Sequence, residues 1–251
     1  THDIGILDVD LVGDWGRLEA VYAFQANLRD EFEQVRGYIT GPQYDFTLRT
    51  HTLDTLYSQP TASLDVGFLD GGLGIQGSFQ ENIYSGVPLI PNFRSFSGGL
   101  FAYERLSLEK IDIEAGARFD AMTRSVFIID NSHDAHVRNG TLEEDSCEPR
   151  DNSMNLCPAA YNAGTLSFGT LLHVVPDVLD VKLDLSTASR FPNIDELFML
   201  GSAPTFPVFA YGYPKLGTET VRGGSFTTGL RLELVEAEAS VYSQFVDDYI
   251  Y

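Results

Sequence analysis

A long-range alternation of apolar and polar residues is the feature that most constrains what this chain can fold into. Successive side chains of a β-strand point to opposite faces, so alternation gives a strand one apolar and one polar face. Residues 110–127 show the pattern, and residues 178–190, 226–234 and 236–249 repeat it. In the first segment the apolar face carries Ile111, Ile113, Ala115, Ala117 and Phe119, and the polar face carries Asp112, Glu114, Arg118 and Asp120.

Two all-β architectures produce this alternation. The antiparallel sheet of a soluble sandwich turns its apolar face to a core, and a membrane barrel turns it to lipid. The segments here run to roughly ten residues or more, the length that a tilted strand needs to cross a bilayer, whereas ordinary strands average about five or six. Short turns at residues 13–16, 108–109, 175–177 and 234–236 also alternate with long connections at 35–44, 82–94, 130–162 and 191–218. We therefore predict an all-β fold, an antiparallel transmembrane β-barrel.

The pattern gives about ten candidate strands. They cover residues 4–12, 17–33, 46–58, 73–81, 95–106, 110–127, 165–174, 178–190, 220–234 and 236–249. Between residues 60 and 72 the alternation fixes no register, and Gly71-Gly72 suggests a bend. No solenoid repeat or low-complexity linker divides the chain, so residues 1–251 are expected to form a single region.

Composition and charge narrow the possible functions. The hydrophobic fraction is 43% and the mean hydropathy is −0.07, and no run approaches the ~20 apolar residues of a spanning helix. The formal net charge of −20 argues against nucleic-acid binding, because phosphate contacts need a basic surface. The many acidic residues of segment 130–151 either keep an exposed loop soluble or bridge divalent cations, including to anionic lipid headgroups. No basic-then-apolar leader follows Thr1, so we expect a processed or excised piece of a protein.

Short motifs recur along the chain in a fixed order. The second half contains three such motifs. The first is S-R-x-P-x-x-x-E-L-F, formed by Ser189, Arg190, Pro192, Glu196, Leu197 and Phe198. The second is G-x-P-x-L-x-x-E, formed by Gly212, Pro214, Leu216 and Glu219, and the third is D-Y-I-Y at residues 248–251. The first half adds Gly13-Asp14-Trp15-Gly16 and the segments 29–33, 50–53, 80–82, 90–91 and 97–101. By order and spacing, most of the chain resembles the β-barrel region of a TonB-dependent outer-membrane receptor.

The resemblance implies an incomplete barrel, because a full family barrel has 22 strands and about ten are visible here. The N-terminal plug domain and the TonB-contacting segment of the family lie outside this sequence, and an open fragment is not expected to transport. An intact parent would sit in the bacterial outer membrane, with lipid, TonB and the plug as partners and no cofactor. It would take up a scarce nutrient such as a ferric siderophore, haem, a metal ion, cobalamin or an oligosaccharide. The alternative is a passive pore or a structural surface barrel.

The alternation also predicts which side chains face lipid. A one-residue slip would exchange the two faces of a strand, so the expectation is specific. The set Val181, Leu183, Leu185, Leu230, Leu232 and Val241 should face lipid, and Asp184, Arg231 and Tyr242 should face the lumen.

Candidate ligand-binding residues lie in and beside the long loop 191–218. Arg190 ends a polar strand face, where it either meets the plug or an anionic ligand at the rim, or forms an ion pair with Glu196. The segment 191–198 can form a short helical turn that starts near Asn193 or Asp195. The aromatic cluster Phe206, Phe209, Tyr211 and Tyr213 either belongs to an interfacial girdle or loop packing, or grips a ligand.

The long loop 130–162 carries histidines and cysteines. His133, Asp134 and His136 are residue types that bind zinc or another divalent metal. For an exported protein, Cys147 and Cys157 are expected to form a disulfide in a loop outside the cell, worth ~2–3 kcal/mol in the chain-entropy view. A thiolate metal site is the alternative.

An enzymatic function is not expected. A hydrolase needs a nucleophile, a base and an orienting group within reach. Ser167 and His173 share a polar strand face but lie six positions apart, roughly 20 Å at ~3.3 Å per residue.

Overall fold

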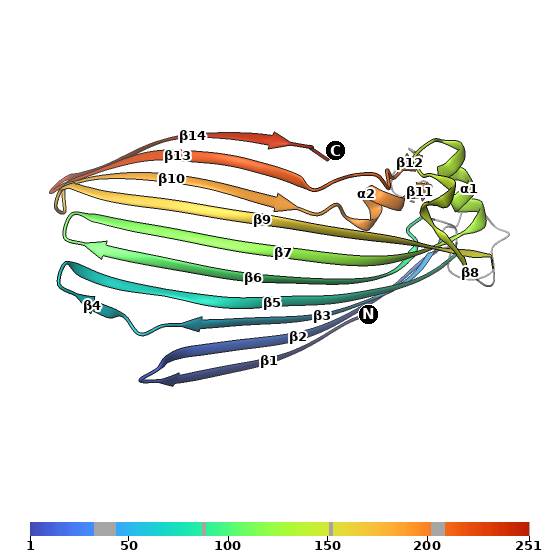
Figure 1. The fold of residues 1–251 in the computed structure, drawn as a ribbon, viewed down its shortest axis with the longest axis horizontal. Coiled ribbons are helices and arrows are strands. Elements are labelled where there is room, and N and C mark those ends of the chain that lie inside the picture. Colours follow the sequence, from blue (N-terminus) through green and yellow to red (C-terminus); the bar gives the residue numbers. More distant parts are fainter. Residues whose placement is uncertain (33–43, 87–88, 151–152, 202–208, 251) are drawn as a thin grey trace.

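A computed structural model describes residues 1–32, 44–86, 89–150, 153–201 and 209–250. Its main feature is one antiparallel sheet in which ten long strands lie side by side (Figure 1). In spatial order they are β1 (His2–Gly13), β2 (Gly16–Glu31), β3 (Tyr44–Ser58), β5 (Gly67–Gly86), β6 (Asn92–Leu108), β7 (Ile111–Ile129), β9 (Met154–Val175), β10 (Leu179–Arg190), β13 (Glu219–Leu232) and β14 (Val235–Asp247). The ten strands expected from the alternation are all present, and the prediction of an antiparallel barrel region is confirmed.

Short strands and helices complete the fold. Two three-residue strands pair with the edges of long ones, β4 (Ala62–Leu64) with β5 and β8 (Glu148–Arg150) with β9. The strands β11 (Leu200–Gly201) and β12 (Ala210–Tyr211) form a separate pair. The helices are α1 (Asp130–Arg138), α2 (Ile194–Phe198) and the 3-10 turn η1 (Glu144–Ser146). In the described part of the chain no helix is long and apolar enough to cross a membrane.

The two ends of the sheet differ, as the loop lengths predicted. At one end, which we call the turn end, tight turns join β1 to β2, β6 to β7, β9 to β10 and β13 to β14 (Figure 1, left). At the other end, the loop end, lie both helices and the short strands β8, β11 and β12 (Figure 1, right). The strands β5 and β9 are 20 and 22 residues long, well beyond the ~9–11 that a bilayer-crossing strand needs, so they extend the sheet into the loop end.

The pairing register separates the two faces as expected. Leu183 lies opposite Thr170 of β9 and Phe226 of β13, while Asp184 lies opposite Gly169 and Ser225. The expected lipid-facing residues therefore share one face, here called the apolar face, and Asp184, Arg231 and Tyr242 share the other, the polar face. The sheet is open, because its edge strands β1 and β14 do not pair with each other within the described residues.

Two sequence expectations are corrected. Residues 130–162 are not one long loop, because α1 starts at Asp130 and residues 154–162 belong to β9, paired with β7. Pro158 has no backbone N–H to donate. It fits there because residues 157–165 pair only with β7 among the described strands, so the other edge of this stretch has no strand that needs a donor. Gly71-Gly72 does not bend the chain but lies inside β5, where the missing side chain of Gly72 leaves room for the ring of Tyr103 on β6.

We predict that arginine substitutions at two adjacent positions of β10 will have opposite consequences. In the full-length protein Leu185→Arg should reduce the free energy of unfolding by about 2–4 kcal/mol, because it places a cation in hydrocarbon near the middle of a spanning strand. The matched variant Ser186→Arg, on the polar face, should change stability little. Urea unfolding in lipid vesicles measures both, and equal effects would show that the register is wrong.

Candidate binding site at the loop end of the sheet

The polar face changes character at the loop end. Along β7 it carries Asp112, Glu114 and Arg118, but its last residues there are Val126 and Ile128, both buried. These two side chains belong to a buried cluster that also contains Leu197 and Phe198 of α2. The α2 segment therefore packs on the polar face of the sheet at its loop end (Figure 1).

Helix α2 has a complete N-terminal cap. Asn193 precedes the helix, its side chain caps the Glu196 amide, and its own backbone N–H donates to Glu196 Oε2 at 2.6 Å. Such a reciprocal capping box satisfies backbone donors that a short helix otherwise leaves unpaired. The helical turn expected near Asn193 is thus confirmed, and it fixes the direction of the Glu196 carboxylate.

Arg190 attaches this cap to the barrel wall. Its Nη1 donates to both carboxylate oxygens of Glu196, each at 2.9 Å, and its Nη2 lies 3.4 Å from Glu219 Oε2. Glu219 is the register partner of Arg190 on β13 and also accepts the backbone N–H of Ile250 at 2.8 Å. With two carboxylates around it, Arg190 has the ion-pair role that was one of the two alternatives, and its charge is already balanced.

A second arginine holds the same segment from β7. Arg124 is buried, and its Nη1 donates to the carbonyl oxygen of Pro192 at 2.9 Å. Its guanidinium carbon also lies 6.0 Å from the centre of the Phe93 ring, within cation–π range. Sequence reasoning missed Arg124, since the alternation identifies it only as one more polar-face residue. Together Arg124 and Arg190 hold the 190–196 segment to the wall at Pro192 and at Glu196.

The aromatic segment 209–213, which contains β12, packs on α2. The Tyr213 N–H donates to the Glu196 carbonyl at 2.7 Å, and the Gly212 N–H donates to the Met199 carbonyl at 2.7 Å. Gly212 is required at this contact, because a Cβ atom there would lie 2.4 Å from the Leu197 carbonyl carbon. The side chains of Phe209, Tyr211 and Tyr213 remain 54%, 55% and 45% exposed. The expected residue Phe206 lies outside the described residues.

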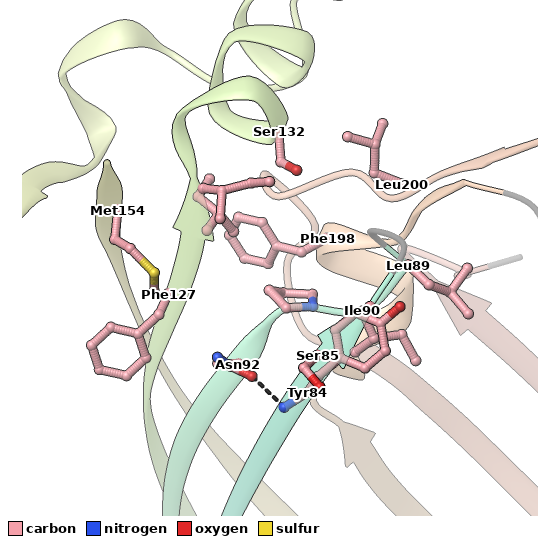
Figure 2. A pocket seen from close by; sticks show the side chains of 14 residues that line it. Tyr84, Ser85, Leu89, Ile90, Asn92, Phe127, Ser132, Met154, Phe198 and Leu200 are labelled. Atoms are coloured by element: carbon pink, nitrogen blue, oxygen red, sulfur yellow. Dashed lines mark hydrogen bonds between the residues drawn. The ribbon is translucent and has the colours of Figure 1, made fainter. Parts of the chain in front are cut away.

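Two cavities adjoin α2. The larger, about 460 Å³, lies between α2 and the polar face and is lined by apolar side chains together with polar groups of β2 and β5. A smaller one of about 310 Å³ lies at the ends of β5, β6 and β7 (Figure 2), where Phe198 is directed towards it from α2. Leu89 and Ile90 line both. The larger cavity is lined by Asn27, Arg29, Glu31, Phe46, Leu48, Asn82, Leu89, Ile90, Phe93, Ile194, Asp195 and Met199.

Sequence reasoning did not assign these cavity residues to a site. Arg29 and Ile90 nevertheless stand in two of the ordered motifs, residues 29–33 and 90–91, and that order was the available signal. The two positions are 61 residues apart, and only the strand order β2-β3-β5 followed by the return of the chain into β6 brings them to one cavity.

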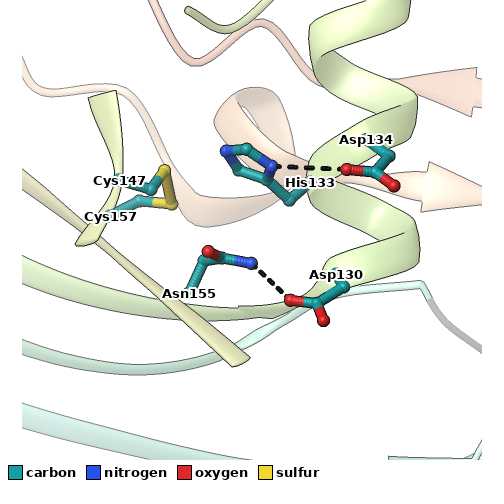
Figure 3. Close-up of a disulfide and its surroundings, with 6 residues drawn as sticks. All are labelled: Asp130, His133, Asp134, Cys147, Asn155 and Cys157. Atoms are coloured by element: carbon teal, nitrogen blue, oxygen red, sulfur yellow. Dashed lines mark hydrogen bonds and ion pairs between the residues drawn. A yellow bond between two sulfur atoms is a disulfide. The ribbon is translucent and has the colours of Figure 1, made fainter. Parts of the chain in front are cut away.

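The cysteine pair lies beside this site. Cys147 and Cys157 form a disulfide with an S–S distance of 2.06 Å, and both are buried in the same cluster as Leu197 (Figure 3). Next to it, Asn155 of β9 donates to Asp130 Oδ1 at 2.9 Å and so ties the start of α1 to the sheet. The disulfide and this hydrogen bond hold the α1 segment against the sheet close to α2.

The expected metal ligands are not brought together. His133 Nδ1 lies 3.7 Å from Asp134 Oδ1, whereas the Nδ1 of His136 is 2.9 Å from Thr141 Oγ1. Over the described ranges, no group of three histidine, cysteine, aspartate or glutamate side chains is placed to hold a metal ion. The geometry therefore gives the metal-site prediction no support.

His136 is instead a buried neutral group. The Thr141 hydroxyl donates to the His136 carbonyl at 3.1 Å, so it accepts from Nδ1–H, and Nε2 is left without a hydrogen-bond partner among the described residues. Burial lowers the pKa of His136 below its usual 6.5, an effect that exceeds the opposing influence of the Phe198 backbone. Protonation thus places a charge in this buried position between α1 and α2, which burial disfavours.

Comparison with known proteins identifies the architecture. A family model described as "TonB dependent receptor-like, beta-barrel" matches residues 6–251. No curated protein matches the chain.

Several solved structures share the fold at low sequence identity. A double mutant of the Serratia marcescens hemophore receptor HasR, in complex with its hemophore HasA and heme, has a TM-score of 0.69 at 14% identity, over 99% of this chain and 40% of that one. The copper transporter OprC gives 0.65 at 16% identity, with coverages of 99% and 40%. The ferric yersiniabactin uptake receptor FyuA from Yersinia pestis gives 0.59 at 13%, with 99% and 36%. The chain thus spans about 40% of the length of the first two structures.

We predict that acidification loosens the α1 segment. Because the folded-state pKa of His136 is lowered, its contribution to stability is full above its unfolded value of 6.5 and declines as pH falls below that value towards the folded pKa. Hydrogen exchange of the α1 amides in the full-length protein, corrected for intrinsic rates, should show more frequent opening at pH 5.5 than at pH 7.5. The variant His136→Phe should flatten this dependence. A pH dependence that survives this substitution would assign it to another group.

Proposed function

Because this chain belongs to the TonB-dependent receptor-like β-barrel family, we propose that its parent protein takes up a scarce nutrient across the bacterial outer membrane. The observation that carries the proposal is the cavity between α2 and the polar face, at the loop end of the sheet. In this role the polar face lines the lumen and the loop end faces outward. The protein acts as a transporter and not as an enzyme.

The cavity suits an amphipathic ligand. Its wall offers apolar side chains such as Leu89, Ile90 and Met199 beside the polar groups of Asn27 and Asn82. Ligand sites in proteins combine an apolar lining with a few placed polar groups in this way. Arg29 of β2 also lines the cavity and is 66% exposed, so it is available to an anionic group of the ligand despite its ion pair with Glu31. Metal chelates and haem have this combination of apolar surface and anionic groups.

The exposed aromatic side chains belong to a segment that packs on α2, the helix that adjoins this cavity. Phe209 and Tyr211 have ring centroids 4.8 Å apart, and Tyr213 is anchored to α2 through its backbone. We assign to these three residues the first apolar contact with the ligand. Arg190 has a different role, since both of its carboxylate partners are provided by the chain, and it positions α2 beneath them.

Active uptake and passive diffusion make different demands. An energised receptor needs a plug and a TonB-contacting segment in the parent protein, and a passive pore needs neither. Cells carrying the parent gene should accumulate one member of a test panel of labelled ferric siderophore, haem, copper and cobalamin. Deleting TonB, or adding a protonophore, should abolish this uptake. Accumulation that persists without TonB would favour the passive pore.

We predict that the aromatic residues contribute to ligand affinity and not to assembly. Replacing Phe209, Tyr211 and Tyr213 together by Ala should weaken binding of the transported panel member about tenfold or more, because contact aromatics contribute up to ~2 kcal/mol each. Isothermal titration of the purified full-length protein gives the affinity, and resistance of the folded barrel to detergent reports assembly. Trp15→Ala, at the turn end, is the matched control. Unchanged affinity in the assembled triple variant would leave these residues a packing role only.

A further inference from the structure

One row of charged side chains lies on the apolar face, which takes no part in the proposed uptake. Arg49 of β3, Glu81 of β5 and Arg94 of β6 are successive register partners, so they lie side by side across three strands. Their chain neighbours Leu48, Asn82 and Phe93 line the cavity on the polar face. Because adjacent residues of a strand point to opposite faces, the charged row points outward, towards the membrane.

An adjacent aromatic row gives the depth of the charged row. Two residues closer to the turn end on each strand, Phe24, His51, Phe79 and Phe96 are also register partners on the apolar face. The ring centroids of Phe24 and His51 are 4.8 Å apart, and those of His51 and Phe79 are 6.2 Å apart. Outward aromatic rows of this kind mark the boundary between hydrocarbon and headgroups in membrane barrels.

The opposite boundary is marked at the turn end by Trp15, which stacks on Tyr57 at 6.1 Å. Trp15 and Phe24 are nine positions apart, about 30 Å along the strand at ~3.3 Å per residue. A strand tilted by ~35–45° turns this into roughly 21–24 Å along the membrane normal, close to the ~25 Å apolar band of outer-membrane barrels. The charged row therefore lies just outside the hydrocarbon, at the level of the lipid headgroups.

The row carries one net positive charge. Arg94 Nε donates to Glu81 Oε1 at 2.9 Å, and Arg49 Nη1 lies 3.6 Å from Glu81 Oε2, so two guanidinium groups share one carboxylate. The side chains of Arg49 and Arg94 are 49% and 62% exposed. The outward carboxylate of Asp45, four positions beyond Arg49, is about 13 Å further along the strand.

We propose that Arg49 and Arg94 bind the phosphate of an outer-leaflet lipid headgroup, with Glu81 holding the two guanidinium groups side by side. The planar fork of arginine matches phosphate oxygens and keeps its charge at any cellular pH. The excess of one cation provides the attraction, although the chain as a whole has a net charge of −20. The inference needs only the membrane placement that family membership gives, and it does not depend on which nutrient is transported.

The row contains its own discriminating substitution. If the three side chains formed only a structural ion-pair ladder, Glu81→Gln and the double variant Arg49→Gln/Arg94→Gln would act alike, since both break the ladder. If the arginines bind phosphate, the two variants differ. The double variant loses the cations, whereas Glu81→Gln raises the net positive charge of the row.

The test titrates the purified full-length protein with diphosphoryl lipid A and counts bound lipids by native mass spectrometry. The affinity of the double variant for this probe should be lower by about tenfold or more, because each basic residue contributes ~1 kcal/mol near an anionic lipid surface. Glu81→Gln should bind it as well as the unmodified protein or better. The matched control is Arg222→Gln, because Arg222 is also outward and 65% exposed but is paired one to one with Asp247 at 3.1 Å. That variant should behave as the unmodified protein does.

Three results would overturn the proposal. One is equal weakening in Glu81→Gln and the double variant. Another is unchanged binding when the probe is the same lipid without its phosphates. The third is displacement of the lipid by 10 mM inorganic phosphate, which would indicate a simple anion site. Since no nutrient is added, a failure here leaves the uptake proposal standing, and a failure of uptake leaves this result standing.

Discussion

Backbone hydrogen bonding in a medium without water is the constraint on which the rest of this structure depends. Each N–H and C=O group of a spanning strand must find its partner on a neighbouring strand, because hydrocarbon offers none. Pairing then fixes the register, and the register fixes the face of every side chain. This is why the side chains of Leu183 and Asp184 point to opposite faces. For the same reason the charged row of Arg49, Glu81 and Arg94 lies on the outward face.

The same register explains where the simple alternation stops applying. Along β7 the polar face is charged through most of its length but ends in Val126 and Ile128. At those positions α2 and the disulfide-linked segment pack on the sheet. At these positions the apolar residues on the polar face mark a loop contact, and Phe93 of β6 joins the same cluster.

The difference between the regular strands and the loop end explains how much of the structure the sequence could predict. The strands and their faces were predictable, because a period of two over ten residues has one physical meaning in a membrane barrel. The outer part of β9 was not, since Pro158 and Asn155 are typical of loops and only pairing with β7, joined at Asn155 by β8, makes them strand. For the same reason the Arg190–Glu196 pair was foreseeable within one motif, whereas Arg124 and Pro192 are 68 positions apart.

The buried arginine shows what the barrel wall contributes to the loops. Arg124 reaches α2 through a single backbone carbonyl, with no carboxylate within hydrogen-bond reach among the described residues, so its position depends on rigid flanking strands. Removing a partner from a buried charge is costly, which makes the Pro192 contact hard to break locally. The α2 segment is thereby part of the wall and not a free lid. The aromatic segment 209–213 is in turn held to α2 by the backbone hydrogen bonds of Gly212 and Tyr213.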